Sequence, residues 1–564
     1  MQKLTKHILT GLALSLTALT FAPALSPTVY AAGLSDVSKN TIETSKVMAK
    51  IKASYADNKV IVDNNYDKSL AAHCINGTFV GINAGDNIIE YRGIPFVGEQ
   101  PVNDYRWKPP VEFKKSSAVY EAYHFAKSPC QSINASEPAS MYVQGEDCLY
   151  LNVYKAKNDL PKKPVMVWFH GGAFEQSGTA DPTYNLHNLI KENPDIIAVT
   201  ITYRLGALGF LHLSHLPDGA DYPDAQNLGI LDQKMALKWV KENIANFGGD
   251  PDNITIFGES AGAASVTLLP IVPGAKQYFN KVIAQSGTPV FTRTPEQSIA
   301  CSEEVFDKLN CHSVSDLKKM SAQQLLEASD GLSLRVWPER DDRTIPADPY
   351  AAYERGDCKD IPIITGCNKD ELGYFVYWFG GPEGFNPWAD QRQALKYSQL
   401  NTEELAKVKD FFSELKGERY EKTSELFNHI VFKAPMIRIL ENQSNAGGKA
   451  YGYFFTVESA RPYMLSGHGM ELSSVLNSTD NFRGRKFDET FSKTMRKMWI
   501  QFAKTGDPSI KTSPDGKEHT WPLYETTEKK LMVFDEFDIH TSTESALHLI
   551  DWSRTYFLTK YFCI

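Results

Sequence analysis

One serine lies in a sequence context that suits covalent chemistry. Ser260 is the centre of Gly258-Glu259-Ser260-Ala261-Gly262, which follows an apolar, β-branched run over 254–257 and precedes small residues that favour a helix. A sharp strand-to-helix turn of this kind places the serine at its tip in a strained conformation, and the two glycines let strand and helix pass closely. Unpaired N–H groups at the start of the helix favour negative charge there. The pattern predicts a nucleophilic serine.

A glycine pair some 90 residues earlier could stabilise the charge that such a nucleophile creates. The apolar run 165–169 is typical of a buried strand and opens into His170-Gly171-Gly172-Ala173. Consecutive glycines after a strand expose backbone N–H groups, as an oxyanion hole requires. An ordinary glycine turn is the alternative. The position of this loop before the serine turn favours the oxyanion hole.

Strand and helix patterns alternate around these two loops. They predict an α/β fold, with a large, mostly parallel central sheet covered by helices on both faces. The sheet would bring the loops to its carboxyl edge. The expected strands cover 78–82, 91–96, 146–154, 165–169, 196–203, 254–257, 282–287, 361–367 and 451–457, the last clear core strand. The expected helices cover 235–244, 301–326 and 495–502, where an apolar stripe indicates core packing.

Composition indicates a globular protein with a substantial core. The 564 residues are 42% hydrophobic and 23% charged, and the formal net charge is −9. No Lys/Arg cluster of the kind that follows a phosphate backbone is present, which argues against nucleic acid as a partner. We expect one α/β domain over residues 71–564, although the length could hold several average domains.

The amino terminus has the pattern of an export signal. Lys3 and Lys6 precede an apolar stretch, and Val29-Tyr30-Ala31 offers a cleavage site, so residues 1–32 are expected to be a signal peptide. A membrane anchor is the weaker alternative, because Gly, Thr, Ser and Pro interrupt the stretch. Without another long apolar run, we expect a protein secreted or released to the periplasm, with no membrane segment after cleavage. Residues 33–70 form an amino-terminal extension with no assignable role.

The eight cysteines do not indicate a metal site. None lies in a C-x-x-C pair or in zinc-finger spacing, so structural bridges or buried thiols are expected in an exported protein. No motif requires a metal or any other cofactor.

Short motifs follow one another in order from about residue 77 to 524. They are Gly93-Ile94-Pro95, Glu146-Asp147-Cys148-Leu149-Tyr150-Leu151-Asn152, His170-Gly171-Gly172, Asn227-Leu228-Gly229, Phe247-Gly248-Gly249-Asp250-Pro251, the serine turn, Gln285-Ser286-Gly287, Asn368-Lys369-Asp370-Glu371, Phe502-Ala503-Lys504-Thr505-Gly506 and Trp521-Pro522-Leu523-Tyr524. This ordered series resembles the type-B carboxylesterase and cholinesterase family of α/β-hydrolases. The resemblance implies a serine esterase that cleaves carboxylic esters through an acyl-enzyme.

The resemblance implies a catalytic triad of Ser260, Glu371 and His468. His468 would take the proton of Ser260 and return it to the leaving alcohol, while Glu371 would fix the imidazole tautomer and stabilise the imidazolium. Each residue follows an expected strand. Asp370 is a rival acid one residue away, and the family pattern selects Glu371.

The resemblance also implies the groups around the triad. The oxyanion donors would be the N–H groups of Gly172, Ala173 and Ala261, and Ala173 stands where the family more often has a third glycine. Ser286 matches a serine near the acid, although it could equally cap the end of its strand.

The same resemblance bears on substrate and disulfides. Cholinesterases hold a quaternary ammonium against a Trp in the loop before the Glu-Asp-Cys-Leu motif, but here 131–146 contains no Trp, and Tyr142 is its one aromatic residue. Tyr374 and Phe375 are the expected substrate-binding residues, with helix packing as the alternative. We therefore expect neutral esters with short to medium acyl chains. The family pairs Cys130 with Cys148 and Cys301 with Cys311. Cys358 and Cys367 are expected to be unpaired, and Cys74 and Cys563 have no assigned partner.

Two other functions use the same fold. One is a lipase that acts on lipid-like esters, and the other is a non-catalytic binding or adhesion module. The complete triad favours a hydrolase. Oligomeric state stays open.

Overall fold

The computed structural model describes residues 48–50, 52–53, 55–133, 138–397, 400–478, 485 and 487–549. The predicted signal peptide and Cys563 lie outside this part. A sheet of eleven strands forms the centre, in the order β16-β15-β14-β13-β12-β11-β9-β10-β8-β4-β3. Six of its ten neighbouring pairs are parallel, which confirms the predicted α/β architecture.

The strands of this sheet are β3 (Ile82–Asn83), β4 (Ile88–Pro95), β8 (Tyr150–Ala156), β9 (Lys163–Phe169), β10 (Ile197–Ile201), β11 (Gly249–Glu259), β12 (Lys281–Gln285), β13 (Ile363–Asn368), β14 (Ala450–Phe455), β15 (Lys530–Asp535) and β16 (Asp538–Thr543). A small sheet contains β1 (Ala71–Cys74), β2 (Gly77–Val80) and β5 (Val119–Glu121), and a further pair contains β6 (Ser128–Pro129) and β7 (Gln144–Gly145).

Helices cover both faces of the central sheet. In β9, Val165 and Val167 belong to a hydrophobic cluster with α5 (Leu228–Asn243), α6 (Ala261–Leu268) and α15 (Ala434–Asn445). Met166 and Trp168 point to the other face, toward α3 (His187–Glu192), α16 (Leu472–Leu476) and α17 (Glu489–Thr505). A parallel strand buried on both faces is apolar at every position, which explains the unbroken run in the sequence.

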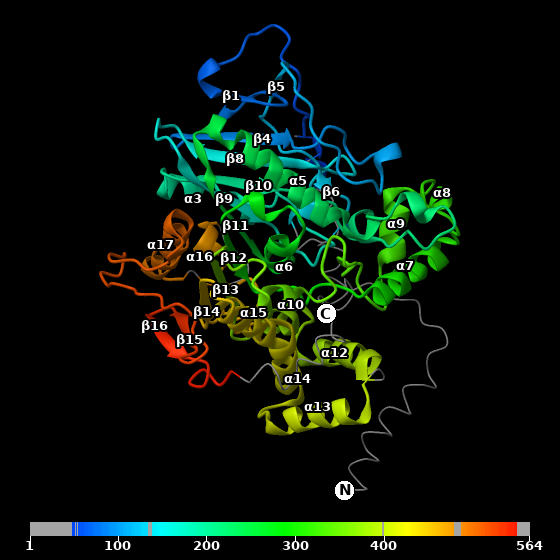
Figure 1. Ribbon diagram of the computed structural model, residues 1–564, viewed down its shortest axis with the longest axis vertical. Coiled ribbons are helices and arrows are strands. Elements are labelled where there is room, and N and C mark those ends of the chain that lie inside the picture. The colour runs from blue at the N-terminus through cyan, green and yellow to red at the C-terminus, as the bar shows by residue number, and fades with distance from the viewer. Residues whose placement is uncertain are drawn as a thin grey trace.

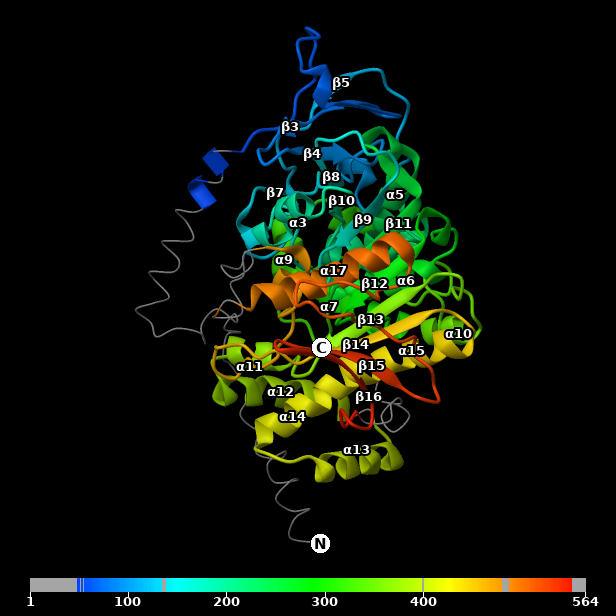
Figure 2. The same ribbon diagram turned by 90° about the vertical axis from the view of Figure 1, so that its left-hand side faces the viewer.

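The other α-helices of the described residues are α4 (Gly206–Phe210), α7 (Pro295–Leu309), α8 (Val314–Leu317), α9 (Ala322–Ser329), α10 (Pro349–Glu354), α11 (Gly373–Trp378), α12 (Pro382–Tyr397), α13 (Thr402–Glu414) and α14 (Arg419–Phe427), and α14 continues into the π-helix η11 (Asn428–Lys433). The small sheet lies at one end of the molecule and α13 at the other (Figures 1 and 2). Figure 2 shows α17, in orange, lying across the sheet.

Three sequence predictions change. The sheet continues past β14, because β15 pairs with β14 in parallel and β16 pairs with β15. The strand expected over 146–154 begins at Tyr150. The helical region 301–326 is three helices, since α7 ends before Asn310, which takes a left-handed φ of 50°.

Residues that precede Ala71 contact both the small sheet and β4. The Asn58 side-chain amide donates to the carbonyl oxygens of Arg92 and His124 at 2.9 and 3.0 Å, and its oxygen accepts the N–H groups of Tyr123 and His124. The backbone of Ile61 donates to Val119 of β5. The segment just before β1 is therefore fastened to the folded domain.

Candidate active site

Ser260 lies on the turn between β11 and α6, with a φ of 58° and a ψ of −123°. This is a costly conformation for a residue with a side chain, and the structure around it must hold it. The Ser260 N–H donates to Gln285 O on β12 at 2.9 Å, and its carbonyl accepts from Ala264 in α6. A Cβ on Gly262 would lie 2.0 Å from the Phe169 carbonyl oxygen, so α6 touches the end of β9 through this glycine.

Glu371 and His468 come together at the ends of β13 and β14. His468 Nδ1 lies 2.6 Å from Glu371 Oε2, and the His468 backbone N–H donates to Glu371 O at 3.1 Å. Glu371 is fully buried, and its Oε1 accepts the N–H of Asn368 at 2.7 Å. A carboxylate can only accept, so His468 Nδ1 carries a proton that it donates to Glu371. Within the described residues, the rival Asp370 makes no hydrogen bond or ion pair with His468, and burial raises the pKa of its carboxyl.

Glu259 is the residue that sequence reasoning missed. Its Oε1 lies 3.0 Å from His468 Nε2, the nitrogen that would face Ser260. Burial alone would lower the pKa of His468, but the carboxylates of Glu259 and Glu371 outweigh it and raise the pKa to about 9. Within the described residues, no hydrogen bond joins Ser260 Oγ to His468. The structure thus holds His468 between two carboxylates, one on each ring nitrogen.

A buried polar network supports the acid. Asn368 Nδ2 donates to Glu471 Oε2 at 2.8 Å and to Gly467 O at 2.7 Å, and Gln285 Nε2 donates to Glu471 Oε1 at 3.0 Å. Burial and the charge of Glu371 raise the pKa of Glu471. These contacts tie the loops after β13 and β14 to β12, and so fix the positions of Glu371 and His468 relative to Ser260.

The loop after β9 passes directly over the serine turn. Gly172, Ala173 and Phe174 all have positive φ, of 94°, 56° and 60°. A Cβ on Gly171 would lie 3.0 Å from Ser260 Cβ, which places this loop against the serine. Among the hydrogen bonds of the described residues, none is donated by the N–H of Gly172 or Ala173. The N–H of Ala261 lies at the start of α6, directly after Ser260.

Two contacts hold this loop from outside. Trp337 Nε1 donates to Ala173 O at 2.7 Å. On the other side, the Tyr203 hydroxyl donates to His170 O at 2.7 Å, and the two rings stack with centroids 4.4 Å apart. Burial lowers the pKa of His170 to about 4, so its ring is neutral near pH 7. Trp337 lies far along the chain, and no local pattern indicated its role.

Ser286 lies behind the serine turn at the end of β12. It has a φ of 56°, and its N–H donates to Gly366 O on β13 at 2.9 Å. Its hydroxyl is buried and has no hydrogen-bond partner within the described residues. A Cβ on the following Gly287 would lie 2.1 Å from Ser260 O, so this strand end packs tightly beneath Ser260.

Aromatic rings surround His468. The ring centroids of Tyr374 and Phe375, both on α11, lie 6.3 Å from that of His468, and that of Phe432 on η11 lies 5.1 Å away. Phe291 packs on Phe432 at 6.0 Å. The sequence indicated the α11 rings, whereas Phe432 comes from a segment without a motif.

Tyr142, the aromatic residue of the 131–146 loop, packs away from these rings. Its ring meets that of Tyr55 at 6.1 Å, and its hydroxyl donates to Phe125 O at 3.4 Å. Pro138 begins a 3-10 helix over Pro138–Met141. In the described part of the chain, Tyr142 makes no hydrogen bond or ring contact with His468.

The described cysteines are all free thiols, so neither expected bridge is present in the structure. Cys130 and Cys148 line one small cavity, and burial raises the pKa of Cys130 to about 12. Cys301 Sγ points to Leu334 O at 3.2 Å. Across the described residues, no group of three or more His, Cys, Asp or Glu side chains could hold a metal, and no helix is long and apolar enough to cross a membrane.

Comparison with known proteins agrees with the fold and the motifs. The sequence model of the carboxylesterase family matches residues 69–546. The chain is 33% identical to a para-nitrobenzyl esterase of Bacillus subtilis over 82% of this chain and 94% of that protein, and 29% identical to mouse cholinesterase over 80% of each. The crystal structure of a Geobacillus stearothermophilus carboxylesterase matches with a TM-score of 0.73 at 31% identity, over 85% of this chain and 99% of that one. The chain belongs to the carboxylesterase family of α/β-hydrolases and is a carboxylic ester hydrolase.

Proposed function

We propose that the protein hydrolyses carboxylic esters through an acyl-enzyme on Ser260. The observation that carries the proposal is the 2.6 Å contact of His468 Nδ1 with the buried Glu371, beside a serine on a strained turn. Ser260 Oγ attacks the ester carbonyl carbon, and its proton passes to His468 Nε2. The tetrahedral intermediate then expels the alcohol, which takes that proton. Water then attacks the acyl carbon and gives a proton to His468 Nε2. The second tetrahedral intermediate expels Ser260 Oγ, which takes that proton, and the carboxylic acid is released.

The negative charge of the intermediate falls on the carbonyl oxygen. The N–H groups of Gly172, Ala173 and Ala261 are the proposed donors to it, because they surround Ser260 and the first two have no other acceptor among the described residues. One such donor contributes about 10²- to 10³-fold to kcat. For this chemistry the Ser260 hydroxyl must donate a hydrogen bond to His468 Nε2. In the structure, Glu259 Oε1 contacts that nitrogen instead.

Rapid mixing with p-nitrophenyl acetate tests the acyl-enzyme. We expect a burst of p-nitrophenolate that equals the enzyme concentration when deacylation is the slower step, and an acetyl group on the Ser260 peptide after acid quenching. The Ser260→Ala variant should carry no acetyl group on that peptide. An acetyl group on a different residue of the wild-type protein, with Ser260 unmodified, would contradict the assignment.

We propose that neutral esters with short to medium acyl chains are preferred. The rings nearest His468, Tyr374, Phe375 and Phe432, make an apolar surround, and the loop before Glu146 supplies no Trp for a quaternary ammonium. A cation over a ring contributes about 0.5 to 2 kcal/mol, most with Trp. A choline thioester should therefore have a kcat/KM within about tenfold of its uncharged carbon isostere, and a larger preference for choline would refute this specificity.

Export completes the proposal. It rests on the charged and apolar pattern of residues 1–32. Amino-terminal sequencing of the protein released by its native host tests export, with a mature chain expected to begin near residue 32.

A further inference from the structure

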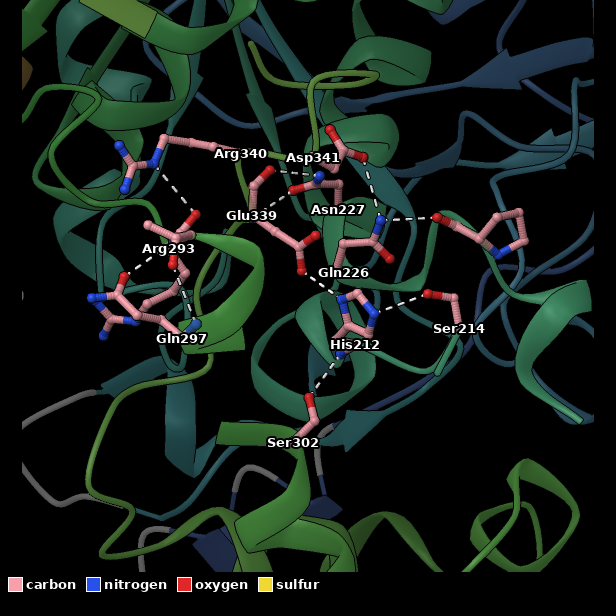
Figure 3. Close-up of polar contacts among 12 residues, drawn as sticks. His212, Ser214, Gln226, Asn227, Arg293, Gln297, Ser302, Glu339, Arg340 and Asp341 are labelled. Carbon is pink, nitrogen blue, oxygen red and sulfur yellow. Dashed lines mark hydrogen bonds and ion pairs between the residues drawn. The ribbon is translucent and has the colours of Figure 1, made fainter. Parts of the chain in front are cut away.

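A second serine, histidine and glutamate meet outside the site around Ser260. Ser214 and His212 follow α4, and Glu339 lies on the segment after Trp337. Ser214 Oγ is 2.9 Å from His212 Nε2, and His212 Nδ1 is 2.6 Å from Glu339 Oε2 (Figure 3). The nitrogen that faces the acid is Nδ1, as it is in His468, and the nitrogen that faces the serine is Nε2.

Charge and hydrogen bonding fix the direction of this chain of contacts. An ionised Glu339 carboxylate can only accept, so His212 carries its proton on Nδ1. Nε2 then presents a lone pair, and the Ser214 hydroxyl donates to it. The three groups therefore have the polarity needed to take a proton from a serine. A purely structural ion pair would need only the contact of His212 Nδ1 with Glu339, and would not need Ser214 at His212 Nε2.

Burial decreases from the acid to the serine. Glu339 is 2% exposed and His212 is 8% exposed, whereas Ser214 is an exposed residue. The acid is thus shielded from water, which strengthens its interaction with the imidazole.

The backbone around the pair is fixed on both sides. Asn227 accepts the N–H of Glu339 at 2.9 Å and donates to its carbonyl oxygen at 2.8 Å. The N–H of His212 donates to Ser302 Oγ at 2.9 Å. Figure 3 shows these partners converging from separate segments on His212 and Glu339. A base held in this way needs little reorganisation to accept a proton.

We propose that Ser214 is a second, surface nucleophile that takes acyl or phosphoryl groups from small activated aryl esters. Ser214 Oγ attacks the carbonyl carbon or phosphorus, its proton passes to His212 Nε2, and the bond to the aryloxy oxygen breaks. The aryloxide leaves with the bonding electron pair, and the imidazolium can protonate it. Activated esters are the substrate class because a phenolate of low pKa leaves without the assistance that an alkoxide needs.

The test uses the full chain with Ser260→Ala, so that the first site cannot react, and diethyl p-nitrophenyl phosphate as the probe. We expect release of p-nitrophenolate together with one diethylphosphoryl group on Ser214, located by peptide mass mapping. Adding His212→Gln should slow this labelling by about 10²-fold, the lower range for a general base. The failure of this result leaves the proposal for Ser260 untouched, because Ser260 is absent from the test.

Ser69 is a matched control within the same digest. It is also classed as exposed, but its hydroxyl donates to the Asp67 carboxylate at 2.7 Å instead of to a histidine. Ser214 should label faster than Ser69 by the same factor of about 10². Equal labelling of the two serines would overturn the proposal, as would an unchanged rate in His212→Gln. If thermal unfolding shows that His212→Gln is misfolded, Ser214→Ala is used in its place. The proposal then requires Ser214→Ala to lower the release of p-nitrophenolate.

Discussion

Gly262→Ala should disable the enzyme while leaving it folded. The new methyl carbon would lie 2.0 Å from the Phe169 carbonyl oxygen, 2.7 Å from its carbonyl carbon and 2.9 Å from the His170 carbonyl oxygen. All three are backbone atoms, so no side chain can swing aside. Phe169 ends β9, which leads into residues 170–174, the loop with two of the proposed oxyanion donors (the oxyanion loop), and Gly262 lies two residues after Ser260. The substitution should therefore force the proposed nucleophile and the proposed donors apart.

The structure sets the size of both effects. Ordinary contact begins at 3.4 Å, so the overlap is about 1.4 Å and must be relieved by movement of α6 or of the β9 end. Overpacking of this kind costs about 3 kcal/mol, the upper part of the usual range. With an unfolding entropy of about 1 kcal/mol/K for a domain of this length, Tm should fall by about 3 °C. A displacement of about 1 Å between reacting groups lowers the rate by about 10²-fold.

The assay measures both Tm and kcat/KM for p-nitrophenyl acetate in the wild-type protein, Gly262→Ala and Gly145→Ala. Gly145→Ala is the matched control, since its methyl carbon would meet the Cδ atom of the flexible Lys127 side chain at 2.8 Å. The control should keep kcat/KM within about twofold, as expected for a change of about 0.5 kcal/mol or less. Gly262→Ala with wild-type kcat/KM would refute the reasoning. A fall in Tm large enough to unfold the protein at the assay temperature would show a general loss of structure instead.

Three further predictions concern the same site. Ser260→Ala should lower kcat for a carboxylic ester by about 10⁶-fold with Tm nearly unchanged; more than a few per cent of wild-type turnover would show that another nucleophile serves that ester. Glu259→Gln removes a carboxylate that raises the pKa of His468 to about 9, so the acidic limb of the kcat/KM profile should move to lower pH. In the wild-type protein the raised pKa stabilises the fold fully below about pH 6.5, and this contribution is lost as the pH rises through about 9, which thermal unfolding across that range would detect.

The sequence was informative where a physical constraint acts on adjacent residues. The strained turn at Ser260 needs glycines two positions to each side, and residues 165–169 of β9, buried on both faces, must be apolar, so both leave a local pattern. In contrast, β15 was missed because its four consecutive apolar residues lie between charged ones, and so short a run has no period of its own.

Residues that reach the site through space left no local pattern. Phe432 approaches His468 from a π-helix, and Trp337 reaches the oxyanion loop from a segment without regular structure. Glu259 lies beside Ser260 in the motif, yet its approach to His468 Nε2 depends on how the loop after β14 folds back. These contacts arise from tertiary packing, which a single sequence does not reveal.

The distribution of the site over the sheet also sets the order in which it can be assembled during synthesis. The oxyanion loop and Ser260 follow β9 and β11, whereas the base follows β14, and Ser260 and His468 are 208 positions apart. At about 5 to 20 residues per second, a ribosome takes roughly 10 to 40 s to add that length. During this interval the emerging chain contains Ser260, the proposed nucleophile, but not yet His468, the proposed base. The strand β12, whose Gln285 carbonyl accepts the Ser260 N–H, is made early in the interval. A nascent chain is therefore unable to use Ser260 on esters until most of it has been made.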